Sequence, residues 1–455
     1  MKTMNSPVDH KYNCLFLPGL PGRIKNFDFF QDITDTGGRV HWLQYSGTYE
    51  SKSVSKFSIS SSVKDIEEAL DELTKKGLPI IVVAYSYSTS LVNMIDYTKY
   101  TSIIGMALFS PIQGLDTSSI NENFQSTIRQ LYKEDDISVD MEDWDGDSLR
   151  SHSNTHYEQF LKELCANSFP VMIAYSQNDT TIKVDDLRKK IANYRSNTAY
   201  NKVLIFEQPD GYHRLDSYYD SKIGNFFRAV EIELDLMKLL ENNIFVYFWG
   251  SSLNYNYSGK DSDIDLLIFY DGYLEKYKEL NNYVEKYNKS HDITFDLSIN
   301  NKADLLSKKI FRYNRGPVAI HELQYAYFPL RQATELIDLD WKDVVKDAYS
   351  ASLILSGESK KILSKCDIGS ERVKKIIKYS ITVFTYLQYV KGVKNLDLNH
   401  VEIYLSTDDP FYESIARSIE LKKLNYKGMT LNDLFSAVKG IDIIIKEQEL
   451  LIGEV

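Results

Sequence analysis

The sequence lacks long apolar runs, paired cysteines and an excess of positive charge. No stretch of its 455 residues reaches the roughly eighteen consecutive apolar residues of a membrane-spanning helix, so no membrane association is expected. The first residues, Met-Lys-Thr-Met-Asn-Ser-Pro, contain no apolar signal core. The three cysteines, Cys14, Cys165 and Cys366, show no C-x-x-C spacing. These absences predict a cytoplasmic protein with buried thiols.

The net charge of −11 argues against broad binding to a nucleic-acid backbone. One local basic cluster is nevertheless present, at Lys308, Lys309, Arg312 and Arg315, with Tyr313 between them. Arginine binds phosphate oxygens with a two-pronged guanidinium, so this cluster is a candidate contact for a triphosphate or a nucleic acid. A solvated helix face explains the same spacing, and both interpretations stay open.

Two carboxylates one residue apart, Asp263 and Asp265, open an apolar run in the second half of the chain. Residues i and i+2 of a strand project from the same face, so these side chains point the same way and can hold a divalent cation. An earlier apolar run ends in Gly250, Ser251 and Ser252. The glycine lets the backbone approach a phosphate closely, and the serines add hydroxyl donors. Together the residues suit a nucleoside triphosphate.

The order of these elements resembles the signature of the DNA polymerase beta-like nucleotidyltransferase superfamily, in its minimal or kanamycin type. The resemblance implies a third carboxylate on a later strand. Asp296, between Phe295 and Leu297, is the first choice, and Asp292 is the alternative. It further implies that Asp263, Asp265 and the third carboxylate are catalytic and hold Mg²⁺ or Mn²⁺. Gly250, Ser251 and Ser252 would then bind the nucleotide.

The first half carries a different pattern, centred on Ser86. The run 78–84 is continuously apolar, which is typical of a strand buried in a parallel sheet, and a helical pattern begins just after Ser86. This arrangement resembles the nucleophile elbow of the α/β-hydrolase family, normally G-x-S-x-G. Ala84 and Ser88 occupy the places of the two glycines. Both are small enough for a turn that packs tightly against its neighbours.

Two later apolar runs each precede a residue that can complete a triad with Ser86. The run 169–176 is followed by Asp179, and the run 202–206 by His213. The order Ser, Asp, His is that of the α/β-hydrolase family. The resemblance implies Ser86 as nucleophile, His213 as general base and Asp179 as its orienting partner. The implied oxyanion hole uses the backbone N–H of Tyr87 and one from the Gly19–Leu20 loop, at Leu20. The missing glycines keep a catalytically silent domain open as an alternative.

The predicted fold class is α/β, in three domains. Residues 1–222 form an α/β-hydrolase-like domain with a mainly parallel sheet and an acidic, lid-like insertion at about 110–168. Residues 223–335 form an α+β nucleotidyltransferase domain with a mixed sheet, and its first helix, 223–242, leads directly into the strand at Ile244. Residues 336–455 form a helical bundle, with helices predicted at Asp340–Leu355, Glu371–Val393, Asp409–Leu424 and Thr430–Leu451.

The leading functional hypothesis is a bifunctional soluble enzyme. The C-terminal half would transfer a nucleoside monophosphate from a nucleoside triphosphate to an acceptor hydroxyl, on a small molecule, a tRNA or a protein. The N-terminal half would hydrolyse an ester or thioester. The alternative is a toxin- or defence-type nucleotidyltransferase that modifies tRNA or a partner protein and uses the hydrolase-like domain as a recognition scaffold. A third hypothesis is a scaffold with neither site active. No sequence motif indicates the acceptor, the nucleotide preference or the oligomeric state.

Overall fold

The computed structural model divides the chain into two compact units. The first comprises residues 1–198, 202–242 and 328–333, and the second comprises 199–201, 243–327 and 334–455. The structure describes residues 1–3, 10–19, 29–46, 59–111, 169–180, 182, 184–196, 203–208, 213, 220–240, 244–249, 264–270, 275–291, 295–306, 316–325, 328–330, 337–365, 370–396, 398 and 401–453. Residues 112–168 of the predicted lid lie outside these ranges.

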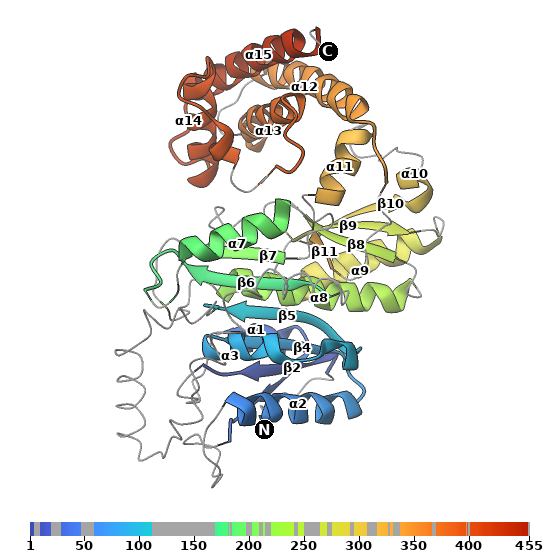
Figure 1. Cartoon of the computed structure of the whole chain (residues 1–455). Coiled ribbons are helices and arrows are strands. Elements are labelled where there is room, and N and C mark those ends of the chain that lie inside the picture. The colour runs from blue at the N-terminus through green and yellow to red at the C-terminus, as the bar shows by residue number, and fades with distance from the viewer. Residues whose placement is uncertain are drawn as a thin grey trace. The chain divides into compact units, whose positions relative to one another are not determined.

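The first unit is built on a seven-stranded sheet with the order β1-β3-β2-β4-β5-β6-β7 (Figure 1). Only β1 runs antiparallel to its neighbour β3, and the other pairs are parallel. The strands are β1 (Lys2–Thr3), β2 (Tyr12–Leu17), β3 (Gly38–Trp42), β4 (Ile80–Tyr85), β5 (Ile103–Phe109), β6 (Val171–Ser176) and β7 (Val203–Gln208). The helical segments are α1 (Phe29–Asp35), α2 (Ile59–Lys75), α3 (Tyr87–Leu91), η1 (Val92–Met94), η2 (Tyr97–Lys99), α7 (Val184–Ser196) and α8 (Asp220–Leu239).

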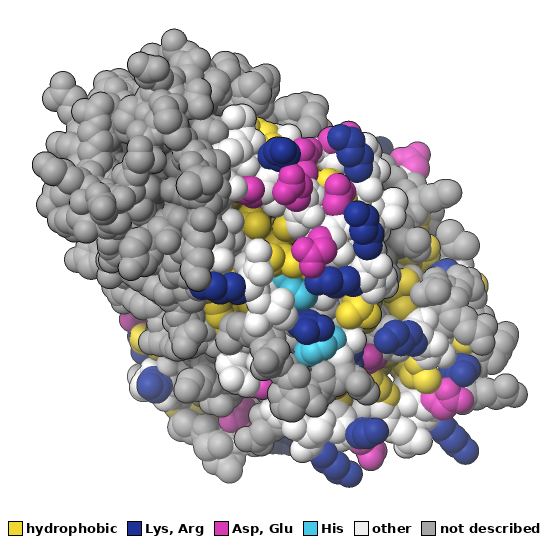
Figure 2. Space-filling view, turned by 90° about the horizontal axis from the view of Figure 1, so that it is seen from below, with side chains coloured by type: hydrophobic (Ala, Val, Ile, Leu, Met, Phe, Trp, Pro, Cys, Tyr) yellow, Lys and Arg dark blue, Asp and Glu magenta, His cyan; other side chains and the backbone are white. Residues whose placement is uncertain are grey.

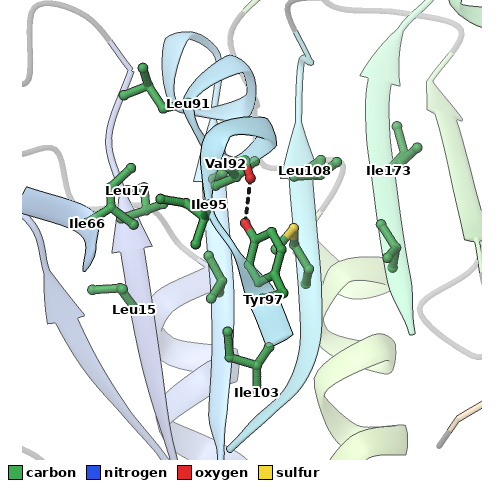
Figure 3. Packing of buried hydrophobic residues seen from close by; sticks show 14 of the residues in the cluster. Leu15, Leu17, Ile66, Leu91, Val92, Ile95, Tyr97, Ile103, Leu108 and Ile173 are labelled. Atoms are coloured by element: carbon green, nitrogen blue, oxygen red, sulfur yellow. Dashed lines mark hydrogen bonds between the residues drawn. The ribbon is translucent and has the colours of Figure 1, made fainter. Parts of the chain in front are cut away.

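The central strands are mostly apolar because both faces of the sheet are covered. Every residue of β2, β5 and β6 is buried, as expected for parallel strands with helices on each side. Figure 3 shows side chains of one resulting core, in which the Tyr97 hydroxyl donates to the Val92 carbonyl at 2.7 Å. Burying this tyrosine is tolerated because its only polar atom is paired.

The strand order reverses at β2 in the first unit. The chain passes from β2 to β3 on one side and then returns to place β4 on the other side of β2. Loops that leave the carboxyl ends of β2 and β4 therefore diverge at a topological switch point, where open α/β sheets form their sites. The mixed α/β architecture with its parallel sheet is consistent with an α/β-hydrolase fold, as the sequence predicted for this half.

Helix α8 lies in the first unit, whereas the sequence placed a domain boundary near residue 222. Lys11, just before β2, contacts Glu231 and Asp235 of this helix at 2.7 Å each. A side chain on Gly105 of β5 would meet the Phe226 ring at 3.5 Å, so the helix lies against the sheet. The apolar spacing of α8 predicts a buried helix but does not tell which neighbouring sheet it covers.

A second, four-stranded sheet has the order β10-β9-β8-β11. Strand β8 (Ile244–Trp249) is antiparallel to β9 (Ile264–Tyr270), and β10 (Phe295–Asn301) is parallel to β9. A parallel neighbour needs a crossover connection, and helix α9 (Glu275–His291) supplies it. The remaining elements are α10 (Lys302–Leu306), α11 (Pro317–Tyr325) and β11 (Phe328–Pro329).

The last part of the chain is helical, as the apolar spacing predicted. Its core is made by residues such as Phe384 of α13 and Ile441 of α15, both with 0% exposure. None of the described helices is both long and apolar enough to cross a lipid bilayer. The helices are α12 (Trp341–Ser364), η6 (Glu371–Val373), α13 (Lys374–Val390), η7 (Val401–Tyr404), α14 (Tyr412–Lys423) and α15 (Leu431–Gly453).

Figure 2 shows one face of the molecule with its side chains. On this face the described lysine and arginine side chains are interspersed with aspartate and glutamate side chains.

Candidate functional site

Ser86 lies in the sharp turn between strand β4 and helix α3. Its backbone has φ 51° and ψ −116°, a combination that L residues rarely adopt and that costs about 1–3 kcal/mol. Neighbouring strands hold the turn, because the Ser86 N–H donates to the Phe109 carbonyl at 2.9 Å. On the helix side, the Thr89 N–H donates to the Ser86 carbonyl at 2.9 Å. The serine is thus fixed at the carboxyl end of the central strand.

The three residues predicted as a triad meet in one hydrogen-bonded chain. The Ser86 Oγ lies 2.7 Å from His213 Nε2, and His213 Nδ1 lies 2.8 Å from Asp179 Oδ2. A carboxylate only accepts hydrogen bonds, so Nδ1 carries the proton of the neutral imidazole and Nε2 accepts from the serine hydroxyl. This tautomer is the one that a general base needs.

Asp179 is fixed more firmly than an exposed carboxylate would be. Its side chain has 0% exposure, and its second oxygen, Oδ1, accepts from the Ile182 N–H at 3.2 Å. The His213 side chain, in contrast, is 22% exposed, which leaves the imidazole accessible. The buried carboxylate therefore anchors the chain of hydrogen bonds, and His213 is its most exposed member, since Ser86 is 9% exposed.

The loop after β2 lies directly against the serine turn. A Cβ atom on Gly19 would lie 3.0 Å from both Ser86 Cβ and Tyr85 Cδ1, so a larger residue here would push on its neighbours, and glycine permits the close approach. Tyr87, the other residue predicted for the oxyanion hole, is the first residue of α3 and is buried. Leu20 lies outside the described residues. The described geometry thus brings the start of the predicted loop next to the nucleophile.

Ser88, which stands at the second glycine position of the G-x-S-x-G pattern, is bonded inside the turn. Its side chain is fully buried, and its Oγ donates to the Pro18 carbonyl and lies 2.5 Å from the Tyr45 hydroxyl. Because the Ser88 proton goes to Pro18, the Tyr45 hydroxyl is the donor to Ser88. Burial raises the pKa of Tyr45 and keeps this donor protonated. Ser88 therefore links the serine turn to the loop after β2.

Two residues near His213 were not predicted from the sequence. The Tyr85 hydroxyl and the Ser110 Oγ each donate to the His213 backbone carbonyl at 3.0 Å. Both residues lie at the carboxyl ends of neighbouring strands, Tyr85 in β4 and Ser110 after β5. That shared position was a usable signal, since sites collect at the carboxyl ends of parallel strands.

In the second unit the structure brings two of the predicted carboxylates into register. Asp296 of β10 pairs with Asp265 of β9, and the two strands are parallel. Paired residues of parallel strands project from the same face, and neighbouring strands lie about 4.8 Å apart. Asp265 is half-buried and Asp296 is exposed. Trp249, the residue before Gly250, is in turn the register partner of Asp265 on β8.

The other predicted residues of this second site lie outside the described ranges. They include Asp263, the first of the three predicted carboxylates, Asp292, the alternative to Asp296, and the predicted nucleotide-binding residues. Within the described residues no group of three potential metal ligands is found. Asp265 and Asp296 nevertheless fit two ligands of Mg²⁺ or Mn²⁺, because carboxylate oxygens are the donors these ions prefer. The predicted residues of this half that the structure does not describe are Gly250, Ser251, Ser252, Asp263, Asp292, Lys308, Lys309, Arg312, Tyr313 and Arg315.

No protein-family model matches the chain, and no curated protein matches it in sequence. Among solved structures, it is similar to the alpha/beta hydrolase domain-containing protein 10 from mouse, with 14% identity, a TM-score of 0.34 and coverage of 52% of this chain and 93% of that chain. It is also similar to a monoacylglycerol lipase from Paleococcus ferrophilus, with 16% identity, a TM-score of 0.36 and coverage of 51% and 98%. A third similarity is to a soluble variant of monoglyceride lipase from Saccharomyces cerevisiae, with 15% identity, a TM-score of 0.34 and coverage of 51% and 89%. At these values the similarities assign no activity to the chain.

Proposed function

We propose that the first unit is a serine hydrolase for esters or thioesters, with Ser86 as nucleophile. The observation that carries the proposal is the hydrogen-bonded chain from Ser86 through His213 to the buried Asp179. The strained backbone of Ser86 supports it, because strain at one serine is costly and is typical of functional sites.

In the proposed reaction, Ser86 Oγ attacks the acyl carbon while its proton moves to His213 Nε2. Asp179 stabilises the imidazolium that forms. The Tyr87 N–H and an N–H of the Gly19–Leu20 loop, at Leu20, donate to the developing oxyanion. His213 then returns the proton to the departing alkoxide or thiolate, which leaves Ser86 acylated. Water, deprotonated by His213, hydrolyses the acyl-enzyme and restores the free serine.

A fluorophosphonate probe tests the first site without a known substrate, since it phosphonylates activated serines. The wild-type protein is expected to react at one residue, and Ser86→Ala is expected to abolish the reaction. Ser102→Ala, in the turn before β5 of the same unit, is the matched control and should react like wild type. Hydrolysis of p-nitrophenyl esters and acyl thioesters would then define the acyl group. Absence of labelling in wild-type protein would overturn the proposal.

A second candidate function is nucleotidyl transfer by the second unit, and the register pairing of Asp265 with Asp296 favours it. These two residues, with Asp263 as the third, would hold Mg²⁺ or Mn²⁺. The ion, when bound, neutralises charge on the triphosphate. Asp265 and Asp296 would hold the ion, and the predicted nucleotide-binding residues follow Trp249, the register partner of Asp265, in the sequence. The acceptor is a hydroxyl on a small molecule, a tRNA or a protein.

Pyrophosphate release from each ribonucleoside triphosphate with Mg²⁺ tests this second site. The reaction is expected to depend on cell extract as the source of acceptor, and to be lost in Asp265→Asn/Asp296→Asn. Asp408→Asn, an exposed position in the helical part, is the control and should retain activity. Fractionating the extract would separate a small acceptor from tRNA or protein. No release from any triphosphate, with or without extract, would remove this candidate.

The two assays together also distinguish the alternative arrangement. Pyrophosphate release without serine labelling would favour a toxin- or defence-type transferase whose hydrolase-like unit is a recognition scaffold. Labelling without release would leave the hydrolase as the sole activity.

A further inference from the structure

The backbone carbonyl of His213 is held at two points by side chains from the sheet. It accepts from the Tyr85 hydroxyl and from the Ser110 Oγ, each at 3.0 Å. A carbonyl oxygen has two lone pairs, so both of its acceptor positions are occupied. His213 is therefore fixed through its main chain as well as through its ring.

The two donors are themselves rigidly placed. Tyr85 ends β4 and pairs with Phe109 of β5, and its ring stacks on the His213 imidazole with centroids 6.1 Å apart and planes at 29°. Ser110 is 1% exposed, and its N–H donates to the Ala174 carbonyl of β6 at 2.7 Å. Its φ of 45° is unusual for a serine and shows that its backbone is held in place by its surroundings.

The geometry points to Tyr85 and Ser110 as positioning residues that hold the His213 imidazole in line with Ser86, an inference that rests on the proposed hydrolase function. The hydrogen bond from Nδ1 to Asp179 fixes one point of the ring but leaves the ring free to pivot about it. Anchoring the carbonyl restricts that pivot, because it fixes the backbone from which the ring extends. A displacement of about 1 Å at a reacting atom can cost a hundredfold in rate.

The test uses Tyr85→Phe and Ser110→Ala, singly and together, each of which removes one donor and little volume. The maximal rate of fluorophosphonate inactivation is expected to fall about tenfold in each single variant and further in the double variant. Probe affinity, measured as the half-saturating concentration, should not change. The pH profile of inactivation should shift in the variants, since the environment of the general base has changed.

Tyr97→Phe is the matched control. It also removes a buried tyrosine hydroxyl that donates to a main-chain carbonyl, that of Val92, in the core shown in Figure 3. It is expected to lower the melting temperature and leave the inactivation rate unchanged. A purely structural role for Tyr85 and Ser110 predicts the same pattern for them.

The outcomes separate the inference from the function on which it rests. If wild-type protein reacts but Tyr85→Phe and Ser110→Ala react at the wild-type rate, the positioning role is overturned and the hydrolase proposal stands. If wild-type protein does not react at all, the proposed function is overturned, and the positioning role with it. Circular dichroism confirms folding, and either single variant suffices if the other fails to fold.

Discussion

The two units assemble their chemically active side chains in opposite ways. In the first unit Asp179, His213 and Ser86 form complementary donor and acceptor pairs, so the group is satisfied without any ligand. In the second unit the register of β9 and β10 places two carboxylates, Asp265 and Asp296, side by side. Paired residues of parallel strands project from the same face of the sheet. The comparison teaches that the first arrangement is joined by direct hydrogen bonds between its members, whereas the second brings together two oxygen-bearing side chains, for which we propose a cation as the ligand.

The largest expected effect comes from the buried end of the first arrangement. Asp179→Asn keeps the shape of the side chain but presents an amide donor to Nδ1, which favours the wrong imidazole tautomer. We expect fluorophosphonate labelling to slow by about 10³–10⁴-fold. Asp185→Asn, whose side chain is 84% exposed on α7, is the control. A loss of less than tenfold would break the comparison, because the hydrogen-bonded chain would then not determine reactivity.

Acid pH is expected to weaken the first unit through a histidine that lies outside the triad. Burial, with the positive charges of Lys76 and Arg39, lowers the pKa of His41 to about 4 from 6.5. The ring is neutral, with Nε2 donating to Asn13 Oδ1 at 2.9 Å and Nδ1 bonded to Thr3 at 3.0 Å. Because the unfolded chain binds the proton more readily, stability is full above pH 6.5 and falls as the pH drops toward 4.

The loss due to His41 amounts to about 3 kcal/mol over that interval. Hydrogen exchange of the β3 amides as a function of pH measures it. In His41→Gln the slope between pH 6.5 and 4 should be smaller than in wild type. An unchanged slope would assign the acid sensitivity to other groups. The experiment sharpens the comparison, because His41 changes the stability of the first unit without being part of the triad.

Ser88→Ala tests whether the first site depends on the link between its turn and the neighbouring loop. The variant leaves the Pro18 carbonyl and the Tyr45 hydroxyl buried without this partner, and it loosens the loop that carries a predicted oxyanion donor. We expect a decrease in labelling rate of about tenfold, smaller than loss of an oxyanion donor itself. Ser88→Gly, which introduces the glycine of the G-x-S-x-G pattern, should behave in the same way. A faster Ser88→Gly variant would show that the link is dispensable.

The smallest expected effect concerns the carboxylate pair. Mg²⁺ should stabilise the wild-type second unit, because an ion held by Asp265 and Asp296 binds the folded unit. In Asp265→Asn, which removes one proposed ligand, the gain should be smaller. Hydrogen exchange of β9 with and without Mg²⁺ measures the gain in both proteins. An equal response of the two proteins to Mg²⁺ would contradict the proposed ion site.

Local sequence patterns identified residues that follow strands, and those are the ones that the structure brings together. Ser86, Asp179 and His213 were predictable because each comes after an apolar run whose carboxyl end lies at a common edge of the sheet. The roles of Tyr85 and Ser110 were not, since donation to a backbone carbonyl more than a hundred residues away leaves no periodic signal.

The unit to which helix α8 belongs also could not be predicted from the apolar spacing of its sequence. Its apolar spacing predicts a buried helix without naming the sheet that it covers. The ion pairs of Lys11 with Glu231 and Asp235, together with the approach of Phe226 to Gly105, show that it belongs with the first sheet. The pairing of Asp265 with Asp296 was expected from the family resemblance, and the register now places them on adjacent strands. Their role with Asp263 in binding an ion stays a prediction.

The strained backbone of Ser86 lowers the free energy of unfolding of the first unit. Glycine adopts a φ of 51° without the penalty that a side chain incurs, so Ser86→Gly is expected to raise the free energy of unfolding. A lineage that no longer used the hydroxyl could gain stability by a single substitution at this codon. At this position, selection for activity favours serine and selection for stability favours glycine.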